Sequence, residues 1–69
     1  MADHAVVGKT GRVTGRIASD RLGEVMIPVR GGTEAFHAYA VDRSEEIITG
    51  SRVLVMEYFP PRTVVVTPL

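Results

Sequence analysis

The stretch VVGKTGRVTGR, residues 6–16, contains the last three letters of a phosphate-binding loop and also alternates like a β-strand. A phosphate-binding loop follows the pattern G-x-x-x-x-G-K-[ST], because its first glycine lets backbone N–H groups surround the phosphate. Asp3 occupies that first position here, and its carboxylate would repel a phosphate. The loop must also begin a helix, whereas residues 12–17 alternate polar and apolar side chains. The stretch therefore predicts a first strand, with Val13 and Ile17 facing inward.

Three glycines, Gly8, Gly11 and Gly15, punctuate this first strand. They do not form the G-x-G-x-x-G loop of a dinucleotide site. Glycines along a strand more often mark a bulge, a bend at a barrel corner or the close approach of another backbone. We therefore expect the glycines to begin a barrel. We expect Arg12 and Arg16, which share one strand face, to lie on its outside.

The composition indicates one small soluble domain. A chain of 69 residues buries only about 60% of the surface that its unfolded form exposes, so five or so short strands fit and a doubly wound nucleotide-binding fold does not. Eight basic residues balance eight acidic ones, which argues against strong non-specific binding to nucleic acid or to an anionic membrane surface. The lack of cysteine excludes disulfides and thiolate chemistry. No apolar run approaches the roughly 20 residues that span a bilayer.

Four more segments carry the alternation or the β-branched residues that are typical of strands. They are residues 24–29, 33–41, 52–59 and 62–67. Pro28 cannot donate a backbone hydrogen bond, so we expect it at a sheet edge or a bulge. Residues 1–6 are predicted to be a flexible N-terminal leader, and residues 7–69 the barrel domain.

The segment DRSEEIITG, residues 42–50, interrupts the alternation between the third and fourth predicted strands. Ser44 is placed to cap a single helical turn that Gly50 would end, and Ile47 or Ile48 would plug one end of the core. Five short strands with an interruption here predict an all-β fold, a small five-stranded Greek-key barrel of the OB type. A short loop or helical turn would then connect strands three and four. An SH3-like barrel is the alternative.

Ten apolar side chains fall on the inward faces of the predicted strands. A barrel of this size needs every large side chain for its core. The predicted core residues are Val13, Ile17, Val25, Ile27, Phe36, Ala38, Val53, Val55, Val64 and Val66.

The residue types that commonly carry catalysis or bind metals show no functional spacing. His4 and His37 are the only histidines, and neither has carboxylates at a recognisable metal-ligand spacing. The serines lie in turn-like contexts without an evident base partner. We therefore expect no catalytic residue, no metal and no cofactor, and we interpret the chain as a non-enzymatic domain.

The segment best suited to contact a partner is Tyr58, Phe59, Pro60, Pro61 and Arg62. It places two aromatic rings and two prolines at a strand end and a stiff turn, and rigid aromatic side chains are good interface anchors. In the alternative interpretation, one ring caps the open end of the barrel and the prolines only fix the turn.

A second candidate surface would suit single-stranded nucleic acid. Lys9, Arg12 and Arg16 would form a basic stripe, and Tyr39 would be the stacking group, as on other OB folds. The zero net charge and the acidic residues on neighbouring segments oppose this interpretation. A solvated strand face of mixed charge is the simpler one.

Glycines and alternating valines recur in a fixed order between residues 7 and 68. They are Val7-Gly8-Lys9-Thr10-Gly11, Gly23-Glu24-Val25, Gly32 with Phe36 and Ala38, Gly50 with Val53 and Val55, and Val64, Val66 and Pro68. This order and spacing resemble the C-terminal soluble domain of NfeD-like membrane proteins. Phe36 stands where that family often has Trp, and the turn within YFPPRT is slightly longer than the usual last hairpin.

The resemblance implies a five-stranded OB-like barrel that follows transmembrane helices and faces the cytoplasm. It also implies a partner of the stomatin or flotillin type, or a second copy of the chain, and a role in membrane organisation or in the regulation of membrane protease activity. Long family members carry a serine-protease domain upstream, and none of it is present here, so no protease activity is expected. A binding module for single-stranded nucleic acid is the alternative function.

Overall fold

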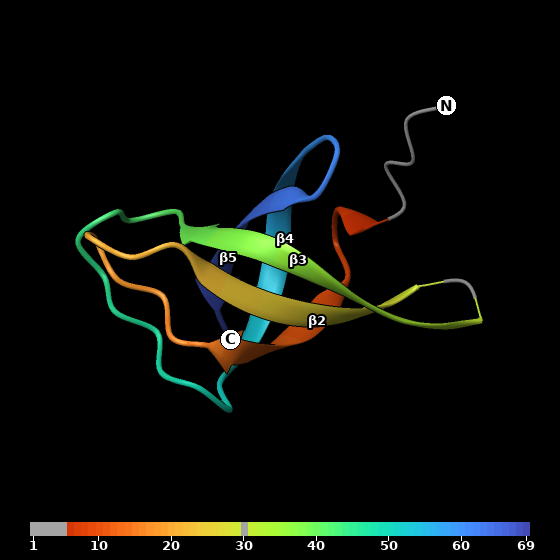
Figure 1. Cartoon of the computed structure of the whole chain (residues 1–69), viewed down its shortest axis with the longest axis horizontal. Coiled ribbons are helices and arrows are strands. Elements are labelled where there is room, and N and C mark those ends of the chain that lie inside the picture. Colours follow the sequence, from red (N-terminus) through yellow and green to blue (C-terminus); the bar gives the residue numbers. More distant parts are fainter. Residues whose placement is uncertain (1–5, 30) are drawn as a thin grey trace.

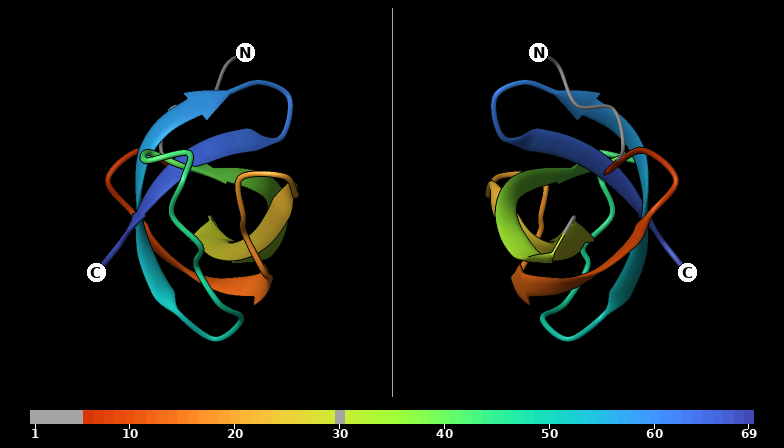
Figure 2. Two further views of the ribbon diagram at one scale, coloured as in Figure 1. Left: turned by 90° about the vertical axis from the view of Figure 1, so that its left-hand side faces the viewer. Right: turned by 90° about the vertical axis from the view of Figure 1, so that its right-hand side faces the viewer.

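A computed structural model describes residues 6–29 and 31–69 of the chain, which form a closed barrel (Figure 1). The views along the barrel in Figure 2 show the strands surrounding one common interior. The five strands are β1 (Thr10–Gly15), β2 (Gly23–Val29), β3 (Gly32–Ala40), β4 (Arg52–Phe59) and β5 (Thr63–Pro68).

The strands follow one another around the barrel in the order β1-β2-β3-β5-β4, and β4 pairs with β1 to close it. All neighbouring strands are antiparallel except β3 and β5, which run parallel from the pair His37–Thr63 to the pair Ala40–Val66. A parallel pair needs a crossover connection, and here the crossover consists of residues 41–62, which include β4. The prediction of an all-β five-stranded barrel of the OB type is confirmed, and the SH3-like alternative is not needed.

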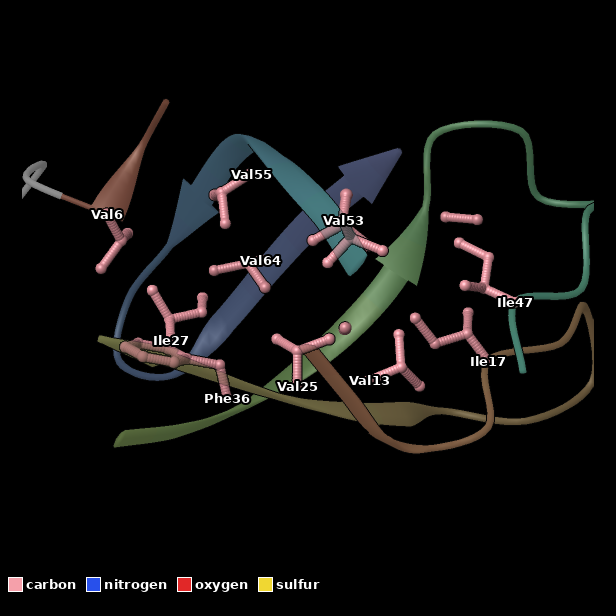
Figure 3. Packing of buried hydrophobic residues seen from close by; sticks show 13 residues of the cluster. Val6, Val13, Ile17, Val25, Ile27, Phe36, Ile47, Val53, Val55 and Val64 are labelled. Atoms are coloured by element: carbon pink, nitrogen blue, oxygen red, sulfur yellow. The ribbon is translucent and has the colours of Figure 1, made fainter. Parts of the chain in front are cut away.

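The core consists of inward-facing side chains from every strand, as Figure 3 shows. All ten predicted core residues are buried. The core also contains three buried residues that are not among those ten, namely Val6, Ala40 and Ile47. Val6 corrects the predicted leader boundary, because its side chain packs in the core; residues 1–5 lie outside the described part of the chain.

The first strand ends earlier than the sequence predicts. β1 stops at Gly15, directly after a shift in its register with β2 between Val13 and Gly15. Ile17 is buried as predicted, but it leaves the sheet and instead forms an isolated bridge with Ile47, with N···O distances of 3.0 and 2.9 Å. The other strand boundaries match the prediction within one residue.

The connection between β3 and β4 is a loop without a helical turn. Ile47 plugs the core at this end, whereas Ile48 is 63% exposed. The loop is fastened to the β1–β2 connection by the Ile17–Ile47 bridge and by a salt bridge between Arg16 and Glu46. The two connections at this end of the barrel therefore support each other, as the left side of Figure 1 shows.

The glycines of the first strand serve the three purposes that the sequence suggested. Gly8 has a φ of +87°, which side chains with a Cβ rarely adopt. A Cβ on Gly11 would lie 2.8 Å from the carbonyl oxygen of Met26, and Gly15 follows the register shift. Pro28 lies beyond the last β1–β2 pair, which is Arg12–Met26, so the predicted edge position is also confirmed.

We expect the substitution Val55→Asp to abolish folding. Val55 is 1% exposed and lies on β4, which closes the barrel. An unpaired carboxylate there would cost several kcal/mol, which is comparable to the roughly 5 kcal/mol available to a small domain. Thermal unfolding followed by circular dichroism measures this. Met56→Asp is the matched control, because Met56 is exposed on the same strand, and that variant should melt cooperatively near the wild-type temperature. A near-native melt of Val55→Asp would contradict the assignment.

The substitution Gly23→Ala should destabilise the domain by about 2 kcal/mol or more, because the site is already filled. A Cβ on Gly23 would lie 2.2 Å from Cγ1 of Ile17 and 2.8 Å from the carbonyl oxygen of Gly15. Gly32→Ala is the control, since in the described part of the chain no atom beyond Gly32 and its two chain neighbours lies within 4 Å of the Cβ position. The free energy of unfolding of this variant should differ from that of the wild type by less than about 1 kcal/mol. Equal effects of the two substitutions in urea unfolding would contradict this packing.

Candidate interaction surface

The β4–β5 hairpin sends its two aromatic rings in different directions. Tyr58 is half-buried and turns toward the end of the barrel, where its hydroxyl donates a hydrogen bond to the carbonyl oxygen of Pro61 at 3.0 Å. Its ring meets Phe36 edge-on, with centroids 6.3 Å apart and ring planes at 86°. Within the predicted contact segment, Tyr58 is thus the ring that caps the core. Pro60 and Pro61 form the exposed turn and are joined by a cis peptide bond.

Arg62 fastens the start of β5 to β3. Its Nη1 donates a hydrogen bond to the carbonyl oxygen of Ala35 at 2.9 Å and lies 3.6 Å from Oε1 of Glu34. Its guanidinium also lies 5.8 Å from the centroid of the Phe36 ring. The ion pair is exposed and therefore contributes about 1 kcal/mol at most. Arg62 is consequently held in place by three groups of β3.

A small pocket of about 280 Å³ opens at this end of the barrel. Part of the predicted contact segment lines it, together with the N-terminal end of the core. The lining residues are Val6, Val29, Glu34, Phe36, Tyr58, Pro61 and Arg62.

Phe59 points away from that pocket onto the outer wall of the barrel. It is 50% exposed and lines a groove of about 460 Å³ that crosses β3, β5 and β4. Tyr39 and Val65 are opposite each other in the parallel β3–β5 pair, and both line this groove. We call it the Phe59 groove. Its residues are Tyr39, Ala40, Val41, Arg43, Glu57, Phe59, Thr63 and Val65.

A turn after β3 positions a charged side chain at the rim of the Phe59 groove. Oδ1 of Asp42 accepts hydrogen bonds from the backbone N–H of Ser44 at 3.0 Å and from its hydroxyl at 2.7 Å. The predicted role of Ser44 as a helix cap is therefore wrong: Asp42 is the acceptor, and it closes a turn rather than a helix. The guanidinium of Arg43, between them in the chain, lies 4.5 Å from the centroid of the Tyr39 ring. A cation–π contact of this kind covers one face of the ring.

The four residues of the predicted nucleic-acid face do not share one hollow. Arg16 is paired with Glu46, and this ion pair raises the pKa of the Arg16 guanidinium. Arg12 lines an outer hollow over β1 and β2, while Tyr39 lies in the Phe59 groove under Arg43. Lys9 is exposed before β1.

The acidic and imidazole groups of the described residues do not gather into a metal-binding cluster. His37 is exposed on the outer face of β3, opposite Thr63 of β5. His4 and Asp3 lie outside the described residues. Among residues 6–29 and 31–69, no helix is long and apolar enough to cross a membrane.

The Phe59 groove joins two residues that the sequence assigned to different surfaces. Phe59 belonged to the predicted partner segment and Tyr39 to the predicted nucleic-acid face. Both line this groove because β5 lies between β3 and β4 and pairs with each of them, through Tyr39–Val65 and Phe59–Thr63. No local pattern in the sequence reports that pairing, so sequence reasoning missed the groove.

In a comparison with known protein families, the NfeD C-terminal domain matches residues 10–67. The chain belongs to the NfeD C-terminal domain family. The matched range contains all of β1 to β4 and nearly all of β5. The resemblance noted in the sequence is therefore confirmed. A comparison with curated proteins found no match.

Solved structures of similar domains share the barrel. The soluble domain of the NfeD protein YuaF from Bacillus subtilis is 32% identical, with a TM-score of 0.80, and the match covers 94% of this chain and 75% of that one. The soluble domain of a membrane protein implicated in regulation of membrane protease activity, from Corynebacterium glutamicum, is 22% identical with a TM-score of 0.75, covering 90% and 89% of the two chains.

A third similar structure comes from Pyrococcus horikoshii. It is the C-terminal domain of stomatin operon partner protein 1510-C from Pyrococcus horikoshii, which is 24% identical, with a TM-score of 0.72 and coverage of 100% of this chain and 97% of that one. At these lower identities the last two structures support the fold alone.

The turn between Asp42 and Ser44, at the rim of the Phe59 groove, should lower the pKa of the Asp42 carboxyl in this NfeD domain. Hydrogen bonds from Ser44 lower the pKa of Asp42 below its ordinary value of 3.8. Because the folded pKa is depressed, the turn's contribution to stability is present above the unfolded pKa and disappears as the pH falls through the folded pKa. An NMR titration of the side-chain carboxyl carbon should show a midpoint below 3.8 in the wild type and closer to 3.8 in Ser44→Ala. An unchanged midpoint in that variant would contradict the turn geometry.

Proposed function

We propose that this NfeD domain is a non-enzymatic protein-interaction module, the soluble C-terminal part of a membrane protein, and that it faces the cytoplasm. Membership of the NfeD family supports the membrane-protein part of this proposal, as do two similar structures, which are soluble domains of an NfeD protein and of a membrane protein. The ionisable side chains with partners serve structural purposes in the described barrel, as in the pairs Arg16–Glu46 and Arg62–Glu34. We therefore propose that the exposed side chains of the barrel bind a partner protein and do not catalyse a reaction.

The proposed partner is a membrane protein of the stomatin or flotillin type, and the proposed process is membrane organisation or the regulation of membrane protease activity. The Pyrococcus horikoshii relative is a stomatin operon partner, which supports a partner of that type. The Corynebacterium glutamicum relative is a membrane protein implicated in regulation of membrane protease activity, which supports that process.

The β4–β5 hairpin, Tyr58 to Arg62, is the proposed contact segment, with Phe59 as its anchor. Tyr58 contacts Phe36 and Pro61, and Arg62 donates a hydrogen bond to β3, so both side chains restrain the conformation of the hairpin.

The single observation that carries this proposal is the position of the Phe59 ring, half exposed beside Tyr39 and Val65 in one groove. A partner residue in that groove would bury aromatic surface on a prearranged wall, which is how interface anchors contribute most of their energy. Arg43 and Glu57 line the groove with opposite charges and would orient the partner.

Phe59→Ala should weaken binding to the partner by about tenfold or more, which is the effect expected for an interface anchor. The measurement is a calorimetric titration of this domain with the soluble part of a stomatin- or flotillin-like protein from the same organism. Ile48→Ala is the matched control, because Ile48 is at least as exposed but lies in the β3–β4 loop. Its affinity should equal that of the wild type.

Equal binding by Phe59→Ala and the wild type would contradict the contact segment while leaving the partner class intact. Failure of the wild type to bind the stomatin- or flotillin-like protein would contradict the partner class itself. Saturable binding of a single-stranded oligonucleotide that weakens steeply with salt would instead favour the alternative function.

A further inference from the structure

Two arginines stand directly opposite each other where the barrel closes. Arg12 of β1 and Arg52 of β4 are partners in the antiparallel ladder, and both are exposed. Their chain neighbours Val13 and Val53 are buried, so both guanidinium groups project from the outer wall. Directly opposite side chains have Cβ atoms about 4.5–5.5 Å apart, and like charges in this position destabilise a sheet.

Neither of these two arginines is neutralised within the described barrel. The ion pairs among residues 6–29 and 31–69 involve Arg16 and Arg62, and no carboxylate lies within 4 Å of Arg12 or Arg52. Glu24, two residues before Met26 on β2, instead accepts a hydrogen bond from the hydroxyl of Thr14 at 2.8 Å. Among the described residues, two positive charges thus stand together without an ion pair to a carboxylate, in a chain whose net charge is zero.

The paired arginines form the rim of a hollow of about 500 Å³ with a largely apolar floor. Met26 lies opposite Arg12 on the other side of β1 and is half-buried. Gly11 adds no side chain, and Pro28 follows on β2. The lining residues are Thr10, Gly11, Arg12, Thr14, Met26, Pro28, Thr33 and Arg52. A volume of this size lies within the range of about 300–1,000 Å³ that ligand sites occupy.

We propose that this hollow binds an acidic, partly apolar segment of a partner protein. A carboxylate of that segment would lie between the guanidinium groups of Arg12 and Arg52, where it accepts charge-assisted hydrogen bonds and relieves their mutual repulsion. An adjacent apolar side chain would cover Met26 and Pro28. Pro28 has no N–H to offer, so the segment is recognised through its side chains and not by addition of a strand to β2.

The chemistry of the hollow favours a protein segment over nucleic acid or membrane. Nucleic acid is held by a row of basic groups that each neutralise a phosphate, and anionic membranes attract clusters of about 4–8 basic residues. This hollow has two charged groups among its eight lining residues. The site is also separate from the Phe59 groove, because Arg52 and Phe59 lie at the two ends of β4, about 23 Å apart along an extended strand.

The test is an NMR titration of the isotope-labelled chain, at low salt, with an acetylated and amidated peptide of alternating glutamate and leucine. The amide signals of Arg12, Met26 and Arg52 should move. Arg12→Gln and Arg52→Gln should each weaken binding by about tenfold. Arg21→Gln, which removes another exposed positive charge from the β1–β2 connection, should bind as the wild type does. The peptide with glutamine in place of glutamate should not bind.

A thermal melt separates this effect from loss of folding. Arg12→Gln removes one member of a repulsive pair, so its melting temperature should equal or exceed that of the wild type.

Short oligothymidylate and phosphatidylglycerol vesicles are titrated in parallel. Binding of either one in place of the peptide, failure of all three to bind, or peptide binding that survives both arginine substitutions would overturn the proposal. Phe59→Ala should leave peptide binding unchanged. Failure of the proposed peptide site can therefore be distinguished from failure of the proposed partner contact at the Phe59 groove.

Discussion

The pairing of β1 with β4 is the interaction on which the rest of the structure depends, because it converts a curved sheet into a closed barrel. The ladder extends beyond the named strands, since the N–H of Val55 donates to the carbonyl oxygen of Lys9 and the N–H of Val13 to that of Ser51, each at 2.9 Å. Closure pairs the two outer strands of the sheet and leaves only short unpaired strand ends, such as the end of β2 at Pro28, where another chain could pair. It also encloses the valine-rich core of a chain too small to build a second layer.

Closure of the barrel also determines the chemistry of its outer wall. Val13 and Val53 face inward, and successive side chains along a strand point to opposite faces, so Arg12 and Arg52 face outward. The register of β1 with β4 then places these two arginines opposite each other. The parallel pairing of β3 with β5 has a similar effect on the opposite side, where it places Tyr39 next to Val65 and within one groove with Phe59. At the Arg12–Arg52 hollow and at the Phe59 groove, the strand pairing that encloses the core also determines which outward side chains are neighbours on the surface.

The sequence predicts those parts of the fold that follow from local periodicity. Strand faces, the ten core residues and the edge position of Pro28 were all predictable, because alternation and the missing N–H act within a few residues. The burial of Val6 was not, since it depends on how the chain enters the barrel before β1 begins. The Asp42–Ser44 turn was missed for a related reason: either side chain could close it, and only the backbone geometry selects Asp42 as acceptor.

The sequence by itself determined that this chain is a small all-β barrel of the NfeD type with valines inside and arginines outside, because alternation and glycine spacing are local properties. Only the tertiary structure decided which outward residues become neighbours. Arg12 meets Arg52, and Tyr39 shares a groove with Phe59, through pairings between strands that are far apart in the chain. Such pairings arise from the register of the closed barrel, to which every strand contributes, and no single segment of the sequence encodes that register.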